Sequence, residues 1–314
     1  MCFKARDIGS GRVLQAMFVS VILASSIQAA VADPVVVPSD TETGSIEARN
    51  DPIRVGDGAV VKGDIDNRNG AIQLGDNVRV NGSIRSRNGA IAVGDELIAG
   101  DISNRNGGIS LGDGSQVEDV ENRNGSIVIG QNGQAGDVST RNGSIRLETG
   151  AMVDDVETRN GRIMIESQST IKGAVKTRNG KISISGASVA KDITSRNGAV
   201  ELADVNVGGN IQSRNGKINV AGRSEIDGDV VIDLSELEVS GWSMGSPTEL
   251  EIVIAGETQV AGSVLLKLPR EDRSHHTGRV VLGPNASVVG NVVVSPGVET
   301  DLRGEVGGGL VVED

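Results

Sequence analysis

The tripeptide Arg-Asn-Gly recurs nine times between residues 68 and 216, and this repeat constrains the fold more than any other feature of the sequence. We call its arginines the Arg column: Arg68, Arg87, Arg105, Arg123, Arg141, Arg159, Arg178, Arg196 and Arg214. An imperfect tenth copy is Arg49-Asn50-Asp51, and successive copies are 18 or 19 residues apart. Such a period indicates one small structural unit that buries its apolar side chains by stacking against copies of itself.

Aliphatic residues occupy fixed positions in every copy. The position three residues before each arginine is Ile or Val, and the positions four and six residues after it hold apolar pairs such as Ile127 and Ile129. A further apolar residue, Ile98 in one copy, usually falls three or four positions before the first column. Alternation over such short runs predicts short strands, with the Arg column facing solvent. Asn-Gly is expected to make the turn, because both residues tolerate a left-handed backbone.

Two architectures fit short strands separated by Asn-Gly. The first is an antiparallel meander, since Asn-Gly between apolar runs is typical of hairpins. It leaves ten similar units without a second sheet to cover their apolar faces. The second is an all-β parallel β-helix (β-solenoid), in which each unit of 18–19 residues forms one coil and equal positions stack at about 4.8 Å per coil. We predict the parallel β-solenoid, with a right-handed crossover as the default.

The sequence divides into four segments. Residues 1–32 are typical of a secretory signal peptide, because basic residues precede a short apolar stretch and Ala30-Val31-Ala32 fits a cleavage site. Residues 33–43 are expected to be an N-terminal linker, and residues 44–222 the regular solenoid. Residues 223–314 keep the apolar spacing without the tripeptide, which predicts an irregular continuation with a C-terminal cap. We expect a periplasmic or secreted protein, with no transmembrane segment after cleavage.

Aromatic residues are nearly absent from this chain. The sequence has no Tyr, and its 2 Phe both precede residue 33. This argues against any site that needs stacked rings, such as a sugar-stacking platform or a groove for single-stranded nucleic acid. A coil of this size has room inside for rows of Ile, Val and Leu and little room for rings. The one remaining aromatic residue, Trp242, lies where the regular repeats have ended and is a candidate contact for a partner or a cap.

The charge and the cysteine content narrow the class of partner. The formal net charge is −12, and it becomes −14 once Lys4, Arg6, Arg12 and Asp7 are removed with the signal peptide. An acidic surface disfavours duplex DNA, whose phosphates require a cationic face. Cys2 is the only cysteine, so the cleaved chain is expected to lack disulfides.

No catalytic or metal-binding motif is evident in the sequence. The two histidines, His275 and His276, are adjacent in the polar segment 269–278, and no third ligand stands at the spacing of a zinc site. We interpret this segment as a solvated loop. Hexapeptide acyltransferases share the coil composition, but the Arg-Asn-Gly coils contain no histidine to act as their base. We therefore expect a non-enzymatic protein without a cofactor or a bound metal.

The Arg column is the best functional candidate in the sequence. In a solenoid its guanidinium groups form a single file, and like charges about 5 Å apart repel by roughly 1 kcal/mol in water. One interpretation is local neutralisation by acidic neighbours such as Asp66, Glu121 and Asp137. The other is a cationic ridge that binds an anionic polymer, for example an envelope glycan or lipopolysaccharide. The sequence leaves both interpretations open.

Segments such as LGDNVRVNGSI (residues 74–84) and VVGNVVVSPGVETDLRGEV (residues 288–306) resemble bactofilins, the polymer-forming β-helical cytoskeletal proteins of bacteria. The resemblance covers most of residues 53–314 and implies a β-helix that self-associates end to end without nucleotide. We thus expect an exported structural protein, either a rigid scaffold or a self-assembling polymer of the cell envelope. The alternative is an adhesin or binding module that grips an anionic polymer through the Arg column.

Overall fold

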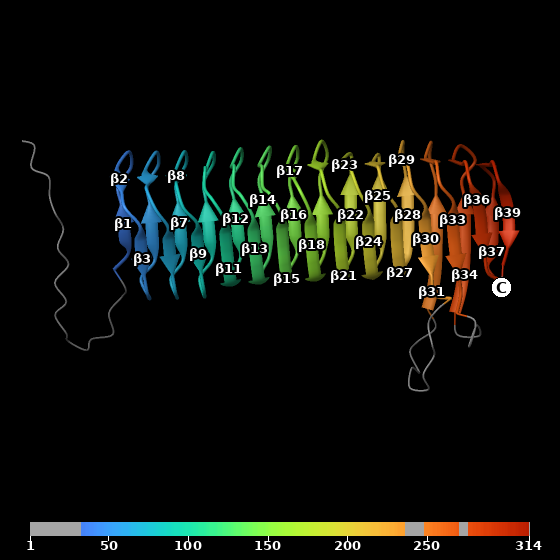
Figure 1. Cartoon of the computed structure of the whole chain (residues 1–314), viewed down its shortest axis with the longest axis horizontal. Helices are drawn as coiled ribbons and strands as arrows, with labels where there is room; N and C mark the ends of the chain where they lie inside the picture. Colours follow the sequence, from blue (N-terminus) through green and yellow to red (C-terminus); the bar gives the residue numbers. More distant parts are fainter. Residues whose placement is uncertain (1–32, 236–247, 270–275, 314) are drawn as a thin grey trace, which may run out of the picture. The chain divides into compact units, whose positions relative to one another are not determined.

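The computed structural model describes residues 33–235, 248–269 and 276–313. The predicted signal peptide and the candidate residues Trp242 and His275 lie outside these ranges. All 39 described strands belong to parallel sheets that stack as a β-solenoid of 14 coils (Figure 1). The predicted fold class is confirmed, and the antiparallel meander is excluded. No helix in the described part of the chain is long and apolar enough to cross a membrane.

Each coil contributes one strand to each of two long faces, and most coils add a two-residue strand on a third, shorter face. The first face consists of β1 (Val35–Val37), β4 (Ile53–Val55), β7 (Ile72–Leu74), β10 (Ile91–Val93), β12 (Ile109–Leu111), β14 (Ile127–Ile129), β16 (Ile145–Leu147), β19 (Ile163–Ile165), β22 (Ile182–Ser185), β25 (Val200–Ala203), β28 (Lys217–Ala221), β31 (Thr248–Ile254), β34 (His276–Leu282) and β37 (Glu299–Leu302). The second face consists of β3 (Ile46–Ala48), β6 (Ile65–Asn67), β9 (Ile84–Ser86), β11 (Ile102–Asn106), β13 (Val120–Asn124), β15 (Val138–Asn142), β18 (Val156–Asn160), β21 (Val175–Asn179), β24 (Ile193–Asn197), β27 (Ile211–Asn215), β30 (Val230–Asp233), β33 (Val264–Lys267), β36 (Asn291–Val294) and β39 (Gly309–Val312).

The third face is built from the two-residue strands and from single bridges between them. Its strands are β2 (Glu42–Thr43), β5 (Val60–Val61), β8 (Arg79–Val80), β17 (Met152–Val153), β20 (Thr170–Ile171), β23 (Ser188–Val189), β26 (Asn206–Val207), β29 (Glu225–Ile226), β32 (Gln259–Val260), β35 (Ser287–Val288) and β38 (Glu305–Val306). Isolated bridges from Arg79 through Ile98, Gln116 and Gln134 to Met152 join β8 to β17. The third face is therefore continuous along the stack.

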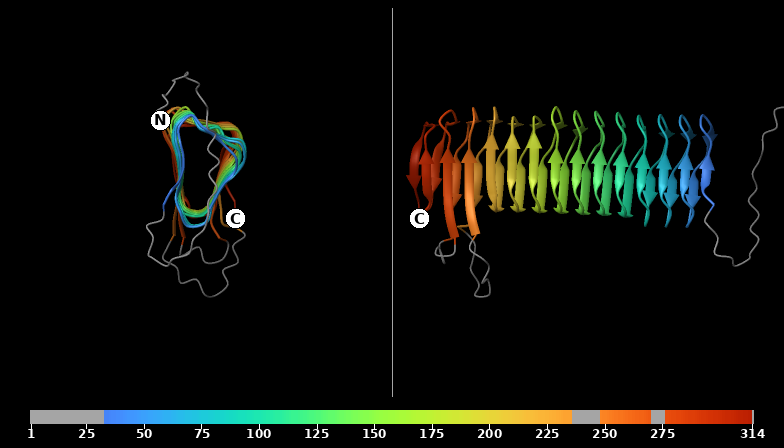
Figure 2. Two further views of the ribbon diagram at one scale, coloured as in Figure 1. Left: turned by 90° about the vertical axis from the view of Figure 1, so that its left-hand side faces the viewer. Right: turned by 180° about the vertical axis from the view of Figure 1, so that it is seen from behind.

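Equal repeat positions lie beside one another in neighbouring coils. On the first face Ile127 pairs with Ile145, and on the second face Asn124 pairs with Asn142. Viewed along the axis, the coils overlie one another (Figure 2). The aliphatic columns fill the interior, where Ile127 and Ile145 are fully buried. One repeat of the sequence is therefore one turn of the solenoid.

The left-handed backbone lies at a different corner from the one expected. None of the Asn residues in the Arg-Asn-Gly copies has a positive φ, and of their glycines only Gly107 and Gly198 do, at 134° and 159°. The positive-φ position instead recurs at the corner between the first and third faces, with φ between 54° and 75° at Asp40, Gly58, Asn77, Glu96, Gly114, Asn132, Gly150, Gln168, Gly186, Asp204, Gly222 and Gly256. A left-handed backbone therefore does not explain the glycine at the Arg-Asn-Gly corner.

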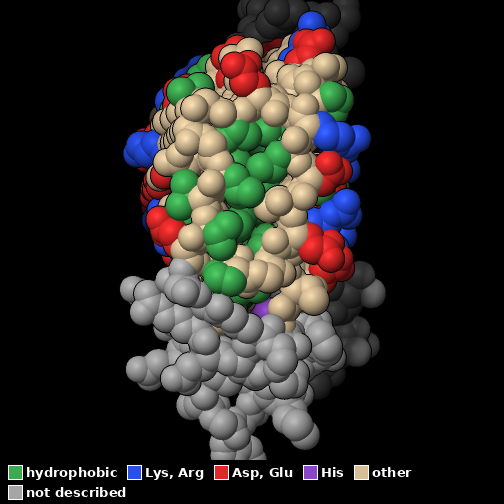
Figure 3. All heavy atoms as spheres, turned by 90° about the vertical axis from the view of Figure 1, so that its right-hand side faces the viewer, with side chains coloured by type: hydrophobic (Ala, Val, Ile, Leu, Met, Phe, Trp, Pro, Cys, Tyr) green, Lys and Arg blue, Asp and Glu red, His purple; other side chains and the backbone are tan. Residues whose placement is uncertain are grey.

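The solenoid begins before the regular repeats and continues after them. Residues 33–43, expected to be a linker, contain β1 and β2 of the first coil, and Val35 of β1 pairs with Ile53 of β4. The described parts of residues 223–313 add β29 to β39 to the same three faces. In the last coil, Leu310 and Val312 stand beside the buried Val292 and Val294, yet they are 47% and 60% exposed. Apolar side chains are visible along the middle of this end of the stack (Figure 3).

Candidate functional site

The Arg-Asn-Gly corner joins the second face to the first. From β11 to β27 the strands of the second face extend through the Arg and Asn of each copy, so that both side chains are carried on regular backbone. Asn106 pairs with Asn124, and Asn124 with Asn142, so the positions repeat coil by coil. The corner therefore presents two parallel rows of side chains. They are the Arg column and what we call the Asn column: Asn50, Asn69, Asn88, Asn106, Asn124, Asn142, Asn160, Asn179, Asn197 and Asn215.

The glycine of each copy is required by the close approach of two coils. A Cβ atom at any of the nine glycines would lie within 3.0 Å of a backbone carbonyl oxygen of the preceding coil, and real Cβ atoms do not approach oxygen that closely. At Gly161 the clash is with the carbonyl of Gly143, and at Gly143 it is with that of Gly125. The glycines thus allow the coils to stack at this corner without the side chain that would push them apart.

A buried polar side chain satisfies the carbonyl of the corner glycine. Thr140 Oγ1 donates to the Gly125 carbonyl over 3.1 Å, and Asn122 Nδ2 donates to that of Gly107 over 2.7 Å. The same bond to the preceding coil is made by Asn104, Thr158, Thr177, Ser195 and Ser213, and Asn67 donates to the carbonyl of Asp51, the residue at the glycine position of the imperfect copy. Ser86 is the exception, because its hydroxyl bonds Gly89 of its own coil. These residues form the inward-facing column one residue before the arginines. A buried carbonyl without a donor is costly, which explains why this inward column is polar.

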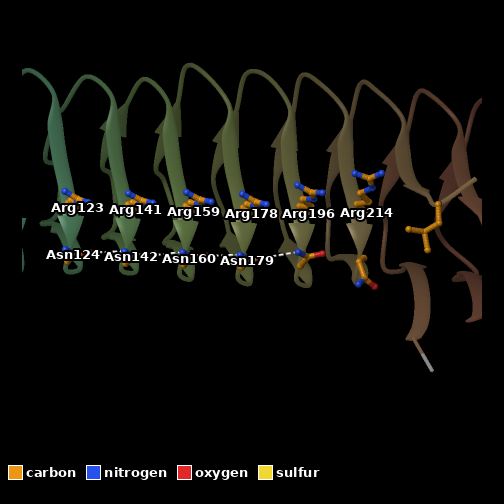
Figure 4. A pocket seen from close by; sticks show the side chains of 13 residues that line it. Arg123, Asn124, Arg141, Asn142, Arg159, Asn160, Arg178, Asn179, Arg196 and Arg214 are labelled. Atoms are coloured by element: carbon orange, nitrogen blue, oxygen red, sulfur yellow. Dashed lines mark hydrogen bonds between the residues drawn. The ribbon is translucent and has the colours of Figure 1, made fainter. Parts of the chain in front are cut away.

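The Arg column faces solvent, as predicted. All nine guanidinium side chains belong to exposed residues, and six of them, from Arg123 to Arg214, point the same way along one corner (Figure 4). Within residues 33–235, 248–269 and 276–313, none of the nine forms an ion pair or a side-chain hydrogen bond. The described structure therefore does not show the local neutralisation of the column that the acidic neighbours suggested.

The corner aspartates serve the backbone instead. Asp137 Oδ1 accepts the N–H of Asp155 over 3.1 Å, and Asp119 accepts the N–H of Asp137 over 2.8 Å. A second such row stands at the corner between the first and third faces, where Asp95 accepts the N–H of Asp113 over 2.8 Å. Each carboxylate thus bonds the next coil rather than an arginine, and charge-assisted bonds of this kind are stronger than neutral ones.

Asp66 pairs with a neighbouring arginine that is not in the Arg column. Its Oδ1 lies 3.9 Å from Nη1 of Arg85, and that same nitrogen is 3.8 Å from Oδ2 of Asp64. Desolvation by burial raises the pKa of Asp66, Arg85 opposes this rise, and the negative charges of Asp64 and Glu47 add to it. The N-terminal part of the Arg column therefore lies beside carboxylates that have their own partner.

The Asn column is tied together by its own amides. Asn142 Nδ2 donates to Asn124 Oδ1 over 2.8 Å, and Asn160 Nδ2 donates to Asn142 Oδ1 over 2.8 Å (Figure 4). Equivalent bonds of 2.7–2.9 Å run from Asn50 to Asn197. Each amide has two N–H groups and two acceptor lone pairs, so an interior member of the column keeps one donor and one acceptor for a ligand.

A groove of about 790 Å³ runs between the two rows. It is lined by the Arg and Asn side chains of six successive copies, from Arg123 and Asn124 to Arg214 and Asn215, and by Leu234. On the other side of the Arg column, a hollow of about 560 Å³ beside Arg68, Arg87 and Arg105 is lined partly by Glu47 and Asp66. The repeat in the sequence predicts the Arg column. The groove depends on the orientation of the side chains, which the repeat does not specify.

The remaining candidates give no site among the described residues. His276 is half-buried at the start of β34, where it pairs with Thr248 in register, so it is part of a strand rather than of a solvated loop. No three His, Cys, Asp or Glu side chains gather as metal ligands in the described ranges. No family model, curated protein or solved structure matches the chain.

Proposed function

We propose that this protein is a non-enzymatic, exported structural protein of the cell envelope, a rigid β-solenoid scaffold that assembles with further copies of itself end to end. The observation that carries this proposal is the apolar end of the stack (Figure 3). In the last coil, Leu310 and Val312 stay exposed beside a buried row. The edges of β37 and β39 have no partner strand beyond them among the described residues. Unpaired edges of this kind favour pairing with another chain.

The first coil offers the matching surface for such a partner. Its strands β1, β2 and β3 lie on the same three faces as β37, β38 and β39 of the last coil. A second copy that stacks its first coil on this end would continue all three sheets in parallel and would cover Leu310 and Val312. The resemblance to bactofilins supports this mode of assembly, because it implies polymerisation through a β-helix without nucleotide.

Sedimentation velocity and negative-stain imaging of the exported protein test this proposal. We expect species longer than one solenoid whose proportion rises with protein concentration. The variant Val312→Lys should shift the population toward single solenoids, since it places a charge in the proposed interface between the last coil of one copy and the first coil of the next. Val289→Lys is the matched control, because Val289 is also an exposed valine, 68% exposed, but lies one coil before the end. Single solenoids at all concentrations would contradict the assembly.

A second function is favoured by the unpaired Arg column: binding of an anionic polymer along the corner. Like charges held in file without a counter-charge in the described structure are an unfavourable arrangement that a bound polyanion would relieve. The triple variant Arg141→Gln/Arg159→Gln/Arg178→Gln should lose retention on heparin or lipopolysaccharide. The control Arg54→Gln/Arg79→Gln/Arg223→Gln removes the same charge from exposed arginines away from the corner. Equal loss in both variants would show that only net charge matters.

A further inference from the structure

The formal charge of the chain is unevenly distributed along the solenoid. Residues 33–122 carry 8 Lys and Arg against 16 Asp and Glu, and residues 216–314 carry 7 against 16. The section between them, residues 123–215, carries 12 Lys and Arg against 9 Asp and Glu, so it is net positive in an acidic chain. This section coincides with the coils whose Arg and Asn side chains line the groove.

Eight of the nine Asp and Glu side chains of this section are already engaged, and the ninth, Glu157, lines a hollow beside Arg141 and Arg159. Asp137, Asp155, Asp192 and Asp204 each accept a backbone N–H from the next coil. Glu148 and Glu166 pair with Arg146, Asp154 with Lys172, and Glu201 with Lys181, all away from the Arg column. By contrast, Arg162 and Lys176 are exposed and form no ion pair with a described residue. They add to the positive charge around the groove.

The N-terminal part of the Arg column is in a different electrostatic setting. Carboxylates line the hollows beside both parts of the column, Glu47 and Asp66 in the N-terminal part and Glu121, Glu157 and Asp233 further along, so the two parts differ in the net charge of the chain around them. A polyanion that extended along the corner beyond Arg123 would pass from the net positive section into one that carries 8 Lys and Arg against 16 Asp and Glu. The same column of arginines therefore has an attractive section from Arg123 to Arg214 and a weaker section before it.

The groove offers two kinds of recognition at every coil. Each guanidinium has five N–H donors in a planar fork that suits a carboxylate or a sulfate. Each interior member of the Asn column keeps a free N–H and a free carbonyl lone pair, which suit a hydroxyl group. A ligand that presents anionic groups on one side and hydroxyl groups on the other satisfies both rows.

Nucleic acid suits this groove less well than an acidic polysaccharide. Its phosphates would reach the Arg column, but single strands gain much of their affinity by stacking bases on aromatic rings. Residues 33–235, 248–269 and 276–313 contain no Phe, Tyr or Trp. An acidic polysaccharide needs no such ring, because its hydroxyl groups bond directly to amides.

We propose that the groove binds one strand of an acidic polysaccharide and that the strand is held between Arg123 and Arg214. The proposal rests on the second function above and specifies its ligand and its extent. Six coils at about 4.8 Å each limit the bound stretch to roughly 24 Å from the first guanidinium to the last. Longer chains gain affinity only through additional protein molecules along the same strand.

The test measures the affinity of the full exported protein for oligogalacturonates of increasing length by isothermal titration calorimetry. We expect the affinity to rise with length and then to level off once the oligomer spans the groove. The methyl-esterified oligomer of the same length, which keeps the hydroxyl groups and loses the charge, should bind at least tenfold more weakly. An oligo(dT) of the same length should also bind more weakly than the acidic oligomer.

Two sets of variants in the Arg column test which part of the column the polysaccharide strand contacts. Arg141→Gln/Arg159→Gln/Arg178→Gln should weaken binding at least tenfold, and Arg68→Gln/Arg87→Gln/Arg105→Gln should cause a loss at least fivefold smaller. All six side chains are exposed and form no side-chain bond in the described structure, so urea unfolding midpoints should stay near that of the parent. Equal losses would contradict the extent of the site but leave polyanion binding standing, and tighter oligo(dT) binding would contradict the ligand class. Absence of binding to every polyanion would overturn the second function itself.

Discussion

Thr158 Oγ1 donates a 3.0 Å hydrogen bond to the carbonyl oxygen of Gly143, one coil earlier in the stack. No backbone N–H of the described loops and turns donates to this carbonyl, and the threonine of the next coil supplies the donor. This relationship links two columns of the repeat that look unrelated in the sequence. The glycine allows two coils to approach closely, and the inward polar side chain bonds the carbonyl of that glycine, so the two columns act together at the corner.

Thr158→Val removes the hydroxyl while it keeps the shape of the side chain. We expect a loss of about 1 kcal/mol in the free energy of unfolding, because the Gly143 carbonyl loses its donor. Urea unfolding followed by circular dichroism measures this change. Thr194→Val is the matched control, since Thr194 is on the outward side of the same face and its hydroxyl makes no hydrogen bond in the described structure. A loss of the same size in the control would contradict this role.

Gly161→Ala should destabilise the solenoid by steric conflict. The added methyl group would meet the carbonyl of Gly143 on rigid backbone, and overpacking of this kind typically costs about 1–3 kcal/mol. The matched control is Gly108→Ala, where the nearest atom to the new Cβ is the Ser126 carbonyl oxygen at 3.5 Å, an ordinary contact. The comparison is made by the urea midpoint of the two variants. If both midpoints moved equally, close approach of the coils would not be the reason for the glycine.

Asn142→Ala should weaken the stack by interrupting the Asn column. The substitution removes two amide bonds, one to Asn124 and one from Asn160, each 2.8 Å long. We expect a loss of about 1 kcal/mol, because exposed hydrogen bonds contribute at the low end of the usual range. Asn215→Ala makes the same change at a position whose amide takes no part in the column bonds of the described residues. Thermal unfolding of the two variants should therefore differ, and identical transitions would remove the column from the account of stability.

Asp66→Asn should raise stability at neutral pH. Desolvation raises the pKa of Asp66 above its ordinary value, so between the unfolded and folded pKa values the native state binds more protons than the unfolded state. Stability consequently falls as pH rises through that window. The variant lacks the ionisable group, so its advantage over the parent should be present above the folded pKa and should vanish below about pH 3.8. Glu121→Gln, an exposed residue in the same column, controls for the loss of one negative charge. An advantage that persisted unchanged in acid would contradict this assignment.

The fold followed from the repeat because a solenoid places equal positions on top of each other, so a column of residues in the sequence is a column in space. The inward Ile and Val and the outward Arg column were predictable from strand alternation alone. One apolar position was misplaced: Ile98 is 37% exposed and Leu97 is fully buried in its place. A one-residue offset in the short third face reverses which of two adjacent aliphatic residues points inward, and both satisfy a hydrophobic pattern.

The site was only partly predictable for a similar reason. Composition gives the sign of each side chain but not its hydrogen-bond partner, so Asp137 looked like a counter-charge for the Arg column when it serves the backbone of Asp155. Asn-Gly is usually associated with a left-handed turn, but here stacking of extended Asn side chains favours a regular strand. The groove arises from the combination of these two departures.

The hydrogen bonds between coils have a mechanical consequence. They connect each coil to the next one along the axis, as between Gly125 and Asn142 or Gly143 and Asn160. Tension along the axis would pull these bonds along their own direction, so coils could be peeled off one at a time from an end. Compression instead presses closely packed backbone together, and at the glycine corners the coils are already too close to approach further. The molecule is therefore suited to act as a strut that holds two things apart, and poorly suited to act as a rope.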